Sequence, residues 1–246
     1  MKRRICLVDC RIPEEAEGRL SLLGFEVMKL PPHPALSEAV ASHTDMLICP
    51  LGNEIISVAE YCDVAPYIFT DLFDVIGKSG KRIYFTDERL SQDYPRDCAL
   101  NVLRMGDYLF ARVDSCAPYI LERARLLGLR IINVRQGYPA CTVLRLDDTH
   151  AITADAGMAR AMRSVGITVY EIESGSIDLP PHEYGFIGGA AKAYDGAVYF
   201  MGNPDLHPDG AKIRGACEIL GLKTVSLFNG RLFDVGGIFF IDGDLD

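Results

Sequence analysis

The chain has 246 residues, of which 49% are hydrophobic and 24% are charged, a composition typical of a globular protein with a large core. We expect one domain over residues 1–246. The net charge of −9 and the lack of a dense Lys/Arg block argue against nucleic-acid binding. No apolar run reaches the roughly 20 residues of a membrane helix, and the N-terminus shows no signal-peptide pattern. We therefore expect a cytoplasmic protein with no membrane partner.

The eight cysteines are scattered without a CxxC pair. In the absence of a secretion signal, they are interpreted as reduced thiols and not as a disulfide framework. Cys6 and Cys10 form the one close pair, and no second pair completes a tetrahedral zinc site. The sequence therefore predicts neither a metal site nor a cofactor.

Taken in chain order, the predicted elements repeat one pattern five times. A helix ends at a glycine, and an alternating apolar strand follows directly. These strands are introduced by Gly24, Gly80, Gly128, Gly166 and Gly221. Helices are predicted before four of these glycines, over Glu14–Leu23, Ala117–Leu127, Met158–Val165 and Ala211–Leu220. The pattern before Gly80 is weaker.

Apolar hairpins lie between these strands, with polar turn residues that accept a positive φ. Four complete hairpins are predicted, over Met46–Cys49 and Ile55–Val58, Ala99–Leu103 and Tyr108–Ala111, Thr142–Leu146 and Ala151–Thr153, and Ala191–Tyr194 and Ala197–Phe200. The fifth has only its first strand, Ile238–Ile241, and a predicted turn at Asp242-Gly243. The chain opens with an unattached strand, Arg4–Cys10, which can complete that last module.

The sequence therefore predicts an α/β protein made of five strand–turn–strand–helix–strand modules in a ring, a five-bladed α/β propeller closed between its termini. Such closure removes exposed sheet edges. The alternative is an open α/β sheet with coincidental glycine caps. That architecture has about one strand per helix, whereas this sequence has about three, and no GxGxxG fingerprint follows the first strand.

Several motifs resemble the pentein superfamily of guanidine-modifying enzymes, and in particular an uncharacterised bacterial family with that fold. The residues that carry this resemblance are Tyr94-Pro95-Arg96-Asp97 with Asn101, Gln136-Gly137-Tyr138 before Cys141, Ile152-Thr153-Ala154-Asp155, Tyr184-Gly185-Phe186-Ile187-Gly188-Gly189, His207-Pro208-Asp209 and Asp234-Val235-Gly236-Gly237. The resemblance spans nearly the whole chain. It implies a pseudo-fivefold ring whose first strands begin at a central pore that holds the substrate.

In that superfamily a cysteine attacks the guanidinium carbon, a histidine moves protons, and carboxylates hold the cationic nitrogens. A carboxylate pair suits a planar cation, and a cationic neighbour lowers the pKa of a thiol. Cys141 is the candidate nucleophile because it lies at the start of an inner strand. His43 and His207 are the candidate bases. The alternatives are a buried structural cysteine, a loop histidine at position 43 and a helix-capping segment around His207.

The candidate substrate-binding residues lie in the same pre-strand segments. Asp45, Asp97 and Asp234 are candidate cation holders, although acidic residues at strand starts are often solvated or turn-forming. The resemblance adds Asn101, Tyr138, Asp155 and Tyr184 to the substrate-binding set. Asp155 has a second interpretation as the cap of the following helix.

One departure from the superfamily affects the chemistry. The catalytic cysteine of the known enzymes belongs to the last module, and this chain has no cysteine after Cys217. The first hypothesis is therefore a Cys141-dependent hydrolase or transferase acting on C–N bonds of guanidino compounds, of the amidinohydrolase or deiminase type. Its partner would be a small cationic molecule. The alternative is a catalytically inactive pentein that binds a ligand or a protein.

Overall fold

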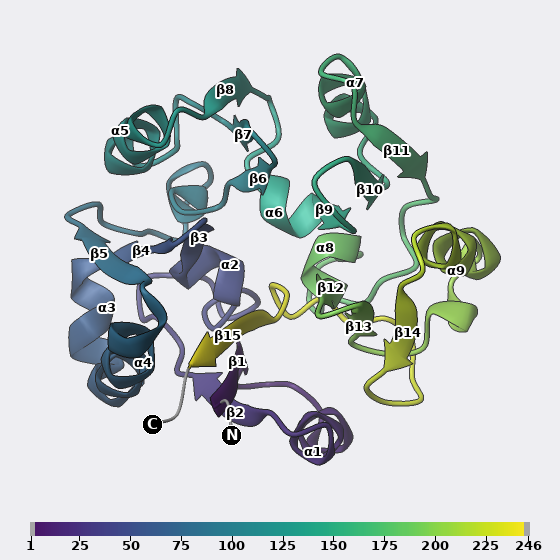
Figure 1. Cartoon of the computed structure of the whole chain (residues 1–246), viewed down its shortest axis with the longest axis horizontal. Coiled ribbons are helices and arrows are strands. Elements are labelled where there is room, and N and C mark those ends of the chain that lie inside the picture. Colours follow the sequence, from purple (N-terminus) through teal and green to yellow (C-terminus); the bar gives the residue numbers. More distant parts are fainter. Residues whose placement is uncertain (1–2, 244–246) are drawn as a thin grey trace.

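The computed structural model describes residues 3–243, in which five three-stranded sheets surround a central axis (Figure 1). In each sheet the second strand pairs antiparallel with the first and parallel with the third. The predicted ring of five modules is therefore confirmed. Figure 1 also shows that the longer helices lie on the outside of the ring and the first strands lie nearest the axis.

We number the modules by the order of their hairpins. The strands of the first four are β3 (Cys49–Leu51), β4 (Glu54–Val58) and β5 (Arg82–Thr86), then β6 (Leu103–Met105), β7 (Tyr108–Ala111) and β8 (Arg130–Asn133), then β9 (Val143–Arg145), β10 (His150–Thr153) and β11 (Thr168–Glu171), then β12 (Ala191–Tyr194), β13 (Ala197–Phe200) and β14 (Lys223–Ser226). The fifth module contains β15 (Phe239–Gly243), β1 (Arg3–Asp9) and β2 (Glu26–Leu30).

The fifth module is completed by both ends of the chain, as the sequence predicts. β15 pairs antiparallel with β1, with Ile241 opposite Ile5, and β1 pairs in parallel with β2, with Ile5 opposite Glu26. The predicted turn at Asp242-Gly243 is wrong, because both residues continue β15 and pair with β1. The ladder to β1 continues through these residues although their types favour turns.

The outer helices connect the second and third strands of each module. They are α1 (Glu14–Leu22), α3 (Ala59–Val64) with α4 (Pro66–Ser79), α5 (Pro118–Leu126), α7 (Ala156–Arg163) and α9 (Gly210–Ile219). All five predicted glycines follow these helices with φ between 67° and 86°, the left-handed conformation that ends a helix. None of the helices among the described residues is long and apolar enough to cross a membrane.

Short helices precede three of the first strands, and the first two of these helices include residues that the sequence predicts as strand. They are α2 (Thr44–Leu47), α6 (Pro139–Thr142) and α8 (Ile187–Ala190). Met46 and Thr142 therefore lie in helical turns, and the predicted strand starts at these residues are wrong. A 3₁₀ turn, η1 (Arg96–Cys98), lies before the first strand of the second module, and another, η2 (Pro204–Leu206), precedes α9. The sequence does not predict these short helices, because four residues make about one helical turn and show no helical periodicity.

The second strand is the middle strand of each sheet, and these strands form the buried core of the modules. Every residue of β4 and β13 is buried, because the sheet is covered by its own helix on one side and by the neighbouring modules on the other. Ile55, Phe110, Ile152 and Val198 are at most 1% exposed. This rigid interior holds the first strands and their preceding turns around the axis.

Candidate functional site

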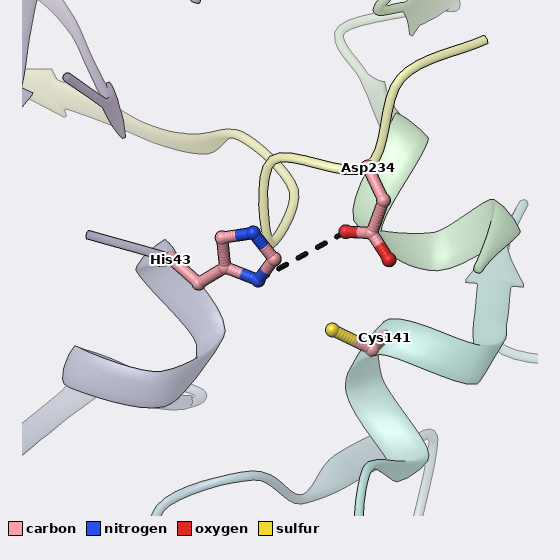
Figure 2. A group of neighbouring side chains, drawn as sticks. All are labelled: His43, Cys141 and Asp234. Carbon is pink, nitrogen blue, oxygen red and sulfur yellow. Dashed lines mark ion pairs between the residues drawn. The ribbon is translucent and has the colours of Figure 1, made fainter. Parts of the chain in front are cut away.

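The turns before the first strands bring a histidine, a cysteine and a carboxylate together at the axis (Figure 2). His43 directly precedes α2, Cys141 lies in α6, and Asp234 lies in the loop before β15. One donor atom from each of the three lies within 4.8 Å of the other two, and all three residues are buried. Pre-strand positions of three different modules thus converge, as the sequence predicts.

Local hydrogen bonds fix α2 against the loop that carries Asp234. Thr44 Oγ1 donates to the carbonyl oxygens of Gly236 and Gly237, at 2.5 and 3.0 Å. Gly236 has a φ of 67°, and a Cβ there would clash with the His43 side chain. Glycine at this position therefore lets the loop pass close enough to place Asp234 beside His43.

Asp234 is oriented by two backbone groups. Its Oδ2 accepts a hydrogen bond from the backbone N–H of Phe186 at 2.8 Å, and its Oδ1 accepts one from Gly236 at 3.0 Å. Burial is the main reason that the pKa of this carboxyl lies above its usual range. The carboxylate is thus fixed in position and faces the axis.

The Cys141 thiol donates to Asp45 Oδ2 at 2.5 Å. Burial, and then repulsion from Asp234, raises the pKa of the Asp45 carboxyl from 3.8 to about 8. Burial and the negative charges of Asp45 and Asp234 also raise the pKa of the Cys141 thiol well above 9.0. The resting thiol is therefore protonated, and a positive charge entering the site would favour the thiolate.

His43 is completely buried, and neither of its ring nitrogens makes a hydrogen bond to the part of the chain that the structure describes. Nδ1 lies 4.0 Å from Asp234 Oδ1, and Nε2 lies 3.8 Å from Asp9 Oδ2. Burial lowers the pKa of His43 more than these two carboxylates raise it. A neutral imidazole between two carboxylates can accept a proton from a neighbouring thiol.

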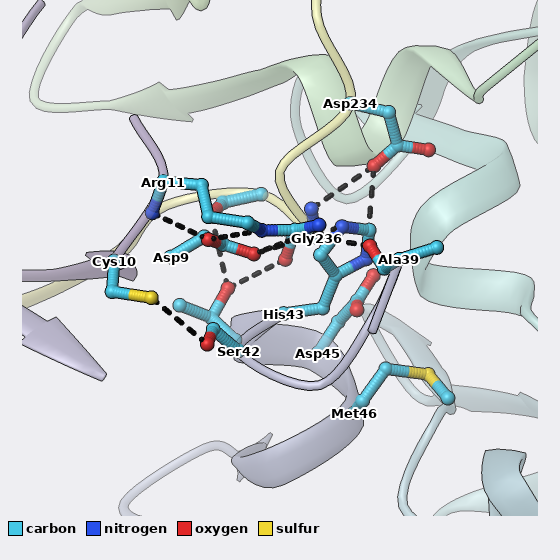
Figure 3. Close-up of polar contacts among 12 residues, drawn as sticks. Asp9, Cys10, Arg11, Ala39, Ser42, His43, Asp45, Met46, Asp234 and Gly236 are labelled. Carbon is cyan, nitrogen blue, oxygen red and sulfur yellow. Dashed lines mark hydrogen bonds and ion pairs between the residues drawn. The ribbon is translucent and has the colours of Figure 1, made fainter. Parts of the chain in front are cut away.

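Asp9 and Arg11 belong to this site but are missing from the sequence prediction. Arg11 binds Asp9 in a bidentate pair, with its Nε 2.9 Å from Oδ1 and one terminal nitrogen 2.6 Å from Oδ2 (Figure 3). The same guanidinium donates to the carbonyl of Ala39, in the segment before His43. The sequence could have pointed to Asp9 by its position, because this carboxylate ends the buried strand β1, which pairs in parallel with β2.

The buried site carries more acidic than basic groups. Asp9 is paired with Arg11, whereas Asp45 and Asp234 have no Lys or Arg partner within 4.0 Å among residues 3–243. Within that range, Asp45 Oδ1 also has no hydrogen-bond partner. The arrangement therefore suits a cationic occupant. The sulfur of Cys141, the imidazole of His43 and the carboxylate of Asp234 are also a donor set for a divalent metal such as Zn²⁺. The sequence does not predict this set, because the three residues lie far apart along the chain.

Asp97, Asn101 and Tyr138 support α6. The Tyr138 hydroxyl donates to Asp97 Oδ2 at 2.5 Å, and Asn101 Oδ1 accepts from the backbone N–H of Ala140 at 2.8 Å. Burial raises the pKa of the Asp97 carboxyl, whose Oδ1 has no hydrogen-bond partner. The structure thus brings these three residues next to Cys141.

The remaining predicted site residues lie elsewhere. Asp155 Oδ1 accepts from the Met158 backbone, the capping role that the sequence offers as an alternative. His207 Nδ1 accepts from the backbone of Asp209 ahead of α9, and Tyr184 is 38% exposed. Among the described residues, no hydrogen bond joins Asp155, His207 or Tyr184 to His43, Cys141 or Asp234.

An axial cavity of about 570 Å³ adjoins the site. Thr44, Asp45, Ala140, Gly188 and Gly236 line it at the site, and the first strands and hairpin turns of the modules line the rest. Asp45 lines the cavity and accepts the hydrogen bond of the Cys141 thiol, whereas Cys141 is not among the lining residues. A small molecule in the cavity would therefore meet a carboxyl before it meets the thiol.

Replacing Asp45 by Asn is expected to stabilise the protein more at pH 8 than at pH 5. The unfolded chain loses this proton near pH 3.8 and the folded protein near pH 8, so this residue lowers the free energy of unfolding as pH rises between them. We expect the gain to differ by about 3–4 kcal/mol between the two pH values, measured by urea unfolding. Asp63→Asn, an exposed carboxylate on α3, is the control. A gain independent of pH would contradict the prediction.

Comparison with solved structures identifies the fold. The amidinotransferase SxtG of Microseira wollei superposes with a TM-score of 0.55 at 14% identity, covering 94% of this chain and 78% of that chain. DDAH of Pseudomonas aeruginosa, solved with citrulline, gives 0.53 at 10% identity and covers 91% of both chains. The inosamine-phosphate amidinotransferase StrB1 of Streptomyces griseus gives 0.53 at 16%, covering 92% of this chain and 78% of that chain. These likenesses show the pentein fold.

The sequence comparisons give the family. Among curated proteins, none matches this sequence. One family model matches residues 7–239, from the first strand to the last. This match covers four modules completely, part of the fifth, and all residues of the site described above. The chain therefore belongs to this family of unknown function (DUF6873) and has the pentein fold.

Proposed function

We propose that the protein is a cysteine-dependent enzyme that acts on the C–N bond of a small guanidinium- or amidinium-type molecule, with Cys141 as nucleophile. The observation that carries this proposal is the meeting of the Cys141 thiol with His43, Asp45 and Asp234 at the axis. Nucleophile, base and cation-holding carboxylates are the parts that such a reaction needs. Citrulline bound to DDAH, which has the same fold, is a ureido molecule of related chemistry.

In this proposal the substrate supplies the charge that activates the thiol. A planar cation held by Asp45 and Asp234 would lower the pKa of Cys141, which in the resting site is raised by burial and by those carboxylates. His43 takes the thiol proton, and the thiolate attacks the central carbon. The C–N bond then breaks, and His43 returns the proton to the leaving amine.

The sulfur–carbon adduct is then resolved by water or by an acceptor amine. Water attacks the same carbon, His43 takes one of its protons, and the C–S bond breaks to give a ureido or amide product and the free thiol. An acceptor amine in place of water would give a transferred amidino group instead. Both outcomes restore Cys141 without an oxidant or reductant.

A cationic alkylating probe tests the proposal directly. Chloroacetamidine is positively charged, whereas chloroacetamide has nearly the same size and no charge. We expect Cys141 to react with the amidine at least about tenfold faster, the effect of lowering its pKa by one unit. Peptide mapping by mass spectrometry gives the rate at each cysteine. Cys62, a partly exposed thiol on α3, is the internal control and should show no such preference.

The site variants sharpen this experiment. Asp45→Asn should reduce the preference for the amidine, because one of the two cation-holding carboxylates is lost, and Cys141→Ser should abolish labelling at that position only. Equal rates with both probes, or no labelling of Cys141 in the folded protein, would overturn the enzyme proposal. The ring would then be a ligand- or protein-binding module, as in the alternative drawn from the sequence.

A further inference from the structure

The first strands of the five modules place one residue each at the same level of the axial cavity. The pairing registers align Arg104, which pairs with Leu109, and Arg145, which pairs with Ala151. The five aligned positions all line the cavity and are Pro50, Arg104, Arg145, Ala193 and Phe240. Two neighbouring modules therefore present an arginine at one level, and the next module presents Lys192 one residue earlier.

Two of these three cations have no acidic partner among the residues that the structure describes. Among residues 3–243, neither Arg104 nor Lys192 forms a salt bridge, and the Arg104 guanidinium lies against Gly52 with its Nε donating to the carbonyl of Gly106. Arg145 donates to the carbonyl of Arg104 at 3.2 Å and pairs with Asp148 at 2.6 Å. Half-buried cations of this kind retain donors for a ligand.

The charges around Lys192 come from several elements. Burial and then the positive charge of Arg145 on β9 lower the pKa of its ammonium group to about 8, and Asp45 beside α2 only partly opposes this effect. The cavity thus holds three cationic side chains, Arg104, Arg145 and Lys192, together with the carboxyl of Asp45 at its inner end.

Acidic residues occur at the hairpin-turn end of the cavity, but their charges are largely engaged. Asp147 accepts hydrogen bonds from the backbone of Thr149 and His150, and Asp148 is bound by Arg145 and by the backbone of Gly106. Asp107 is exposed to solvent, where salt screens its field. These carboxylates do not neutralise Arg104 and Lys192.

We propose that the axial cavity binds a small oxyanion, such as a phosphate or carboxylate group, between Arg104, Arg145 and Lys192. This site is separate from the His43–Cys141–Asp234 group, and the inference does not depend on the enzyme proposal. Guanidinium groups bind planar or tetrahedral oxyanions through paired N–H donors, and the lysine adds a point charge. The cavity volume of about 570 Å³ leaves room for a small organic molecule bearing such a group.

Isothermal titration calorimetry of the full chain with inorganic phosphate, and separately with succinate, tests this inference. Ionic strength is held low and constant, because screening weakens such contacts. We expect saturable binding of at least one of the two anions to one site. Lys192→Met and Arg104→Met should each weaken binding by about tenfold or more, the effect of losing one charge-assisted contact. Lys192 makes no hydrogen bond to the described protein residues, so its variant should keep the fold.

Two further variants are controls. Lys223→Met removes an exposed lysine on β14, in the same module as Lys192 but outside the cavity, and should leave binding unchanged. Cys141→Ser should also bind the anion normally, which separates this inference from the labelling experiment above. No saturable binding of either anion, or equal binding by the parent, Lys192→Met and Arg104→Met proteins, would overturn the inference.

Discussion

Replacing Gly188 by alanine is expected to lower the free energy of unfolding by about 3 kcal/mol or more. An added Cβ would meet the carbonyl oxygens of Ala140, Cys141 and Val143 below 3.0 Å. These atoms belong to the backbone of α6 and the start of β9, which cannot move aside as a flexible side chain could. Urea unfolding followed by circular dichroism measures the loss.

A matched control exists in the same chain. Gly215 lies within α9, and an added Cβ there would meet nothing within 4 Å. Gly215→Ala should therefore raise the free energy of unfolding by about 0.5–1 kcal/mol, because alanine favours helix more than glycine does. If Gly188→Ala is as stable as the parent protein, then α8 and α6 are not packed as closely as described.

Replacing Asp234 by alanine is expected to cost about 3–5 kcal/mol in the free energy of unfolding. The variant leaves the N–H groups of Phe186 and Gly236 buried without an acceptor, and it opens a gap beside His43. Removing a buried carboxylate whose pKa is raised offsets only part of this loss. Chemical unfolding at pH 7 measures the change.

Asp234→Asn distinguishes the hydrogen bonds from the charge. The asparagine oxygen can still accept one of the two N–H groups, so we expect a loss about half as large as that of the alanine variant. The same variant should reduce the amidine preference of Cys141, because a cation-holding carboxylate has been neutralised. A loss below about 1 kcal/mol for Asp234→Ala would show that these backbone groups find other acceptors.

The ring was predictable because its signals repeat. Each glycine after an outer helix has to adopt a positive φ, and the hairpin turns recur between such glycines, so five weak signals support one architecture. The strand predicted over Arg4–Cys10, which the structure places at Arg3–Asp9, was recognised as the missing part of the fifth module for the same reason. Features that occur in only one module were not predictable. One example is the continuation of β15 through Asp242 and Gly243, where pairing with β1 overrides the turn preference of these residues.

The site was predictable only in part. Equivalent pre-strand positions identified His43, Asp45, Cys141 and Asp234, because a ring brings such positions to one axis. Asp9 was missed because it ends a middle strand and approaches His43 from another direction. His207 shows the opposite case, since its nearest polar contact is local and belongs to the start of an outer helix. Three-dimensional proximity of this kind leaves no pattern in residue spacing.

The joining of the two chain ends in one sheet has a consequence for synthesis. β1 is synthesised before its antiparallel partner β15, so the two strands can pair only after all the residues between them have left the ribosome. Until then one edge of β1 offers unpaired backbone groups to other extended segments. Contacts between residues so far apart in sequence also form slowly. Until β15 is in place, β1 is thus open to misassociation with other extended segments.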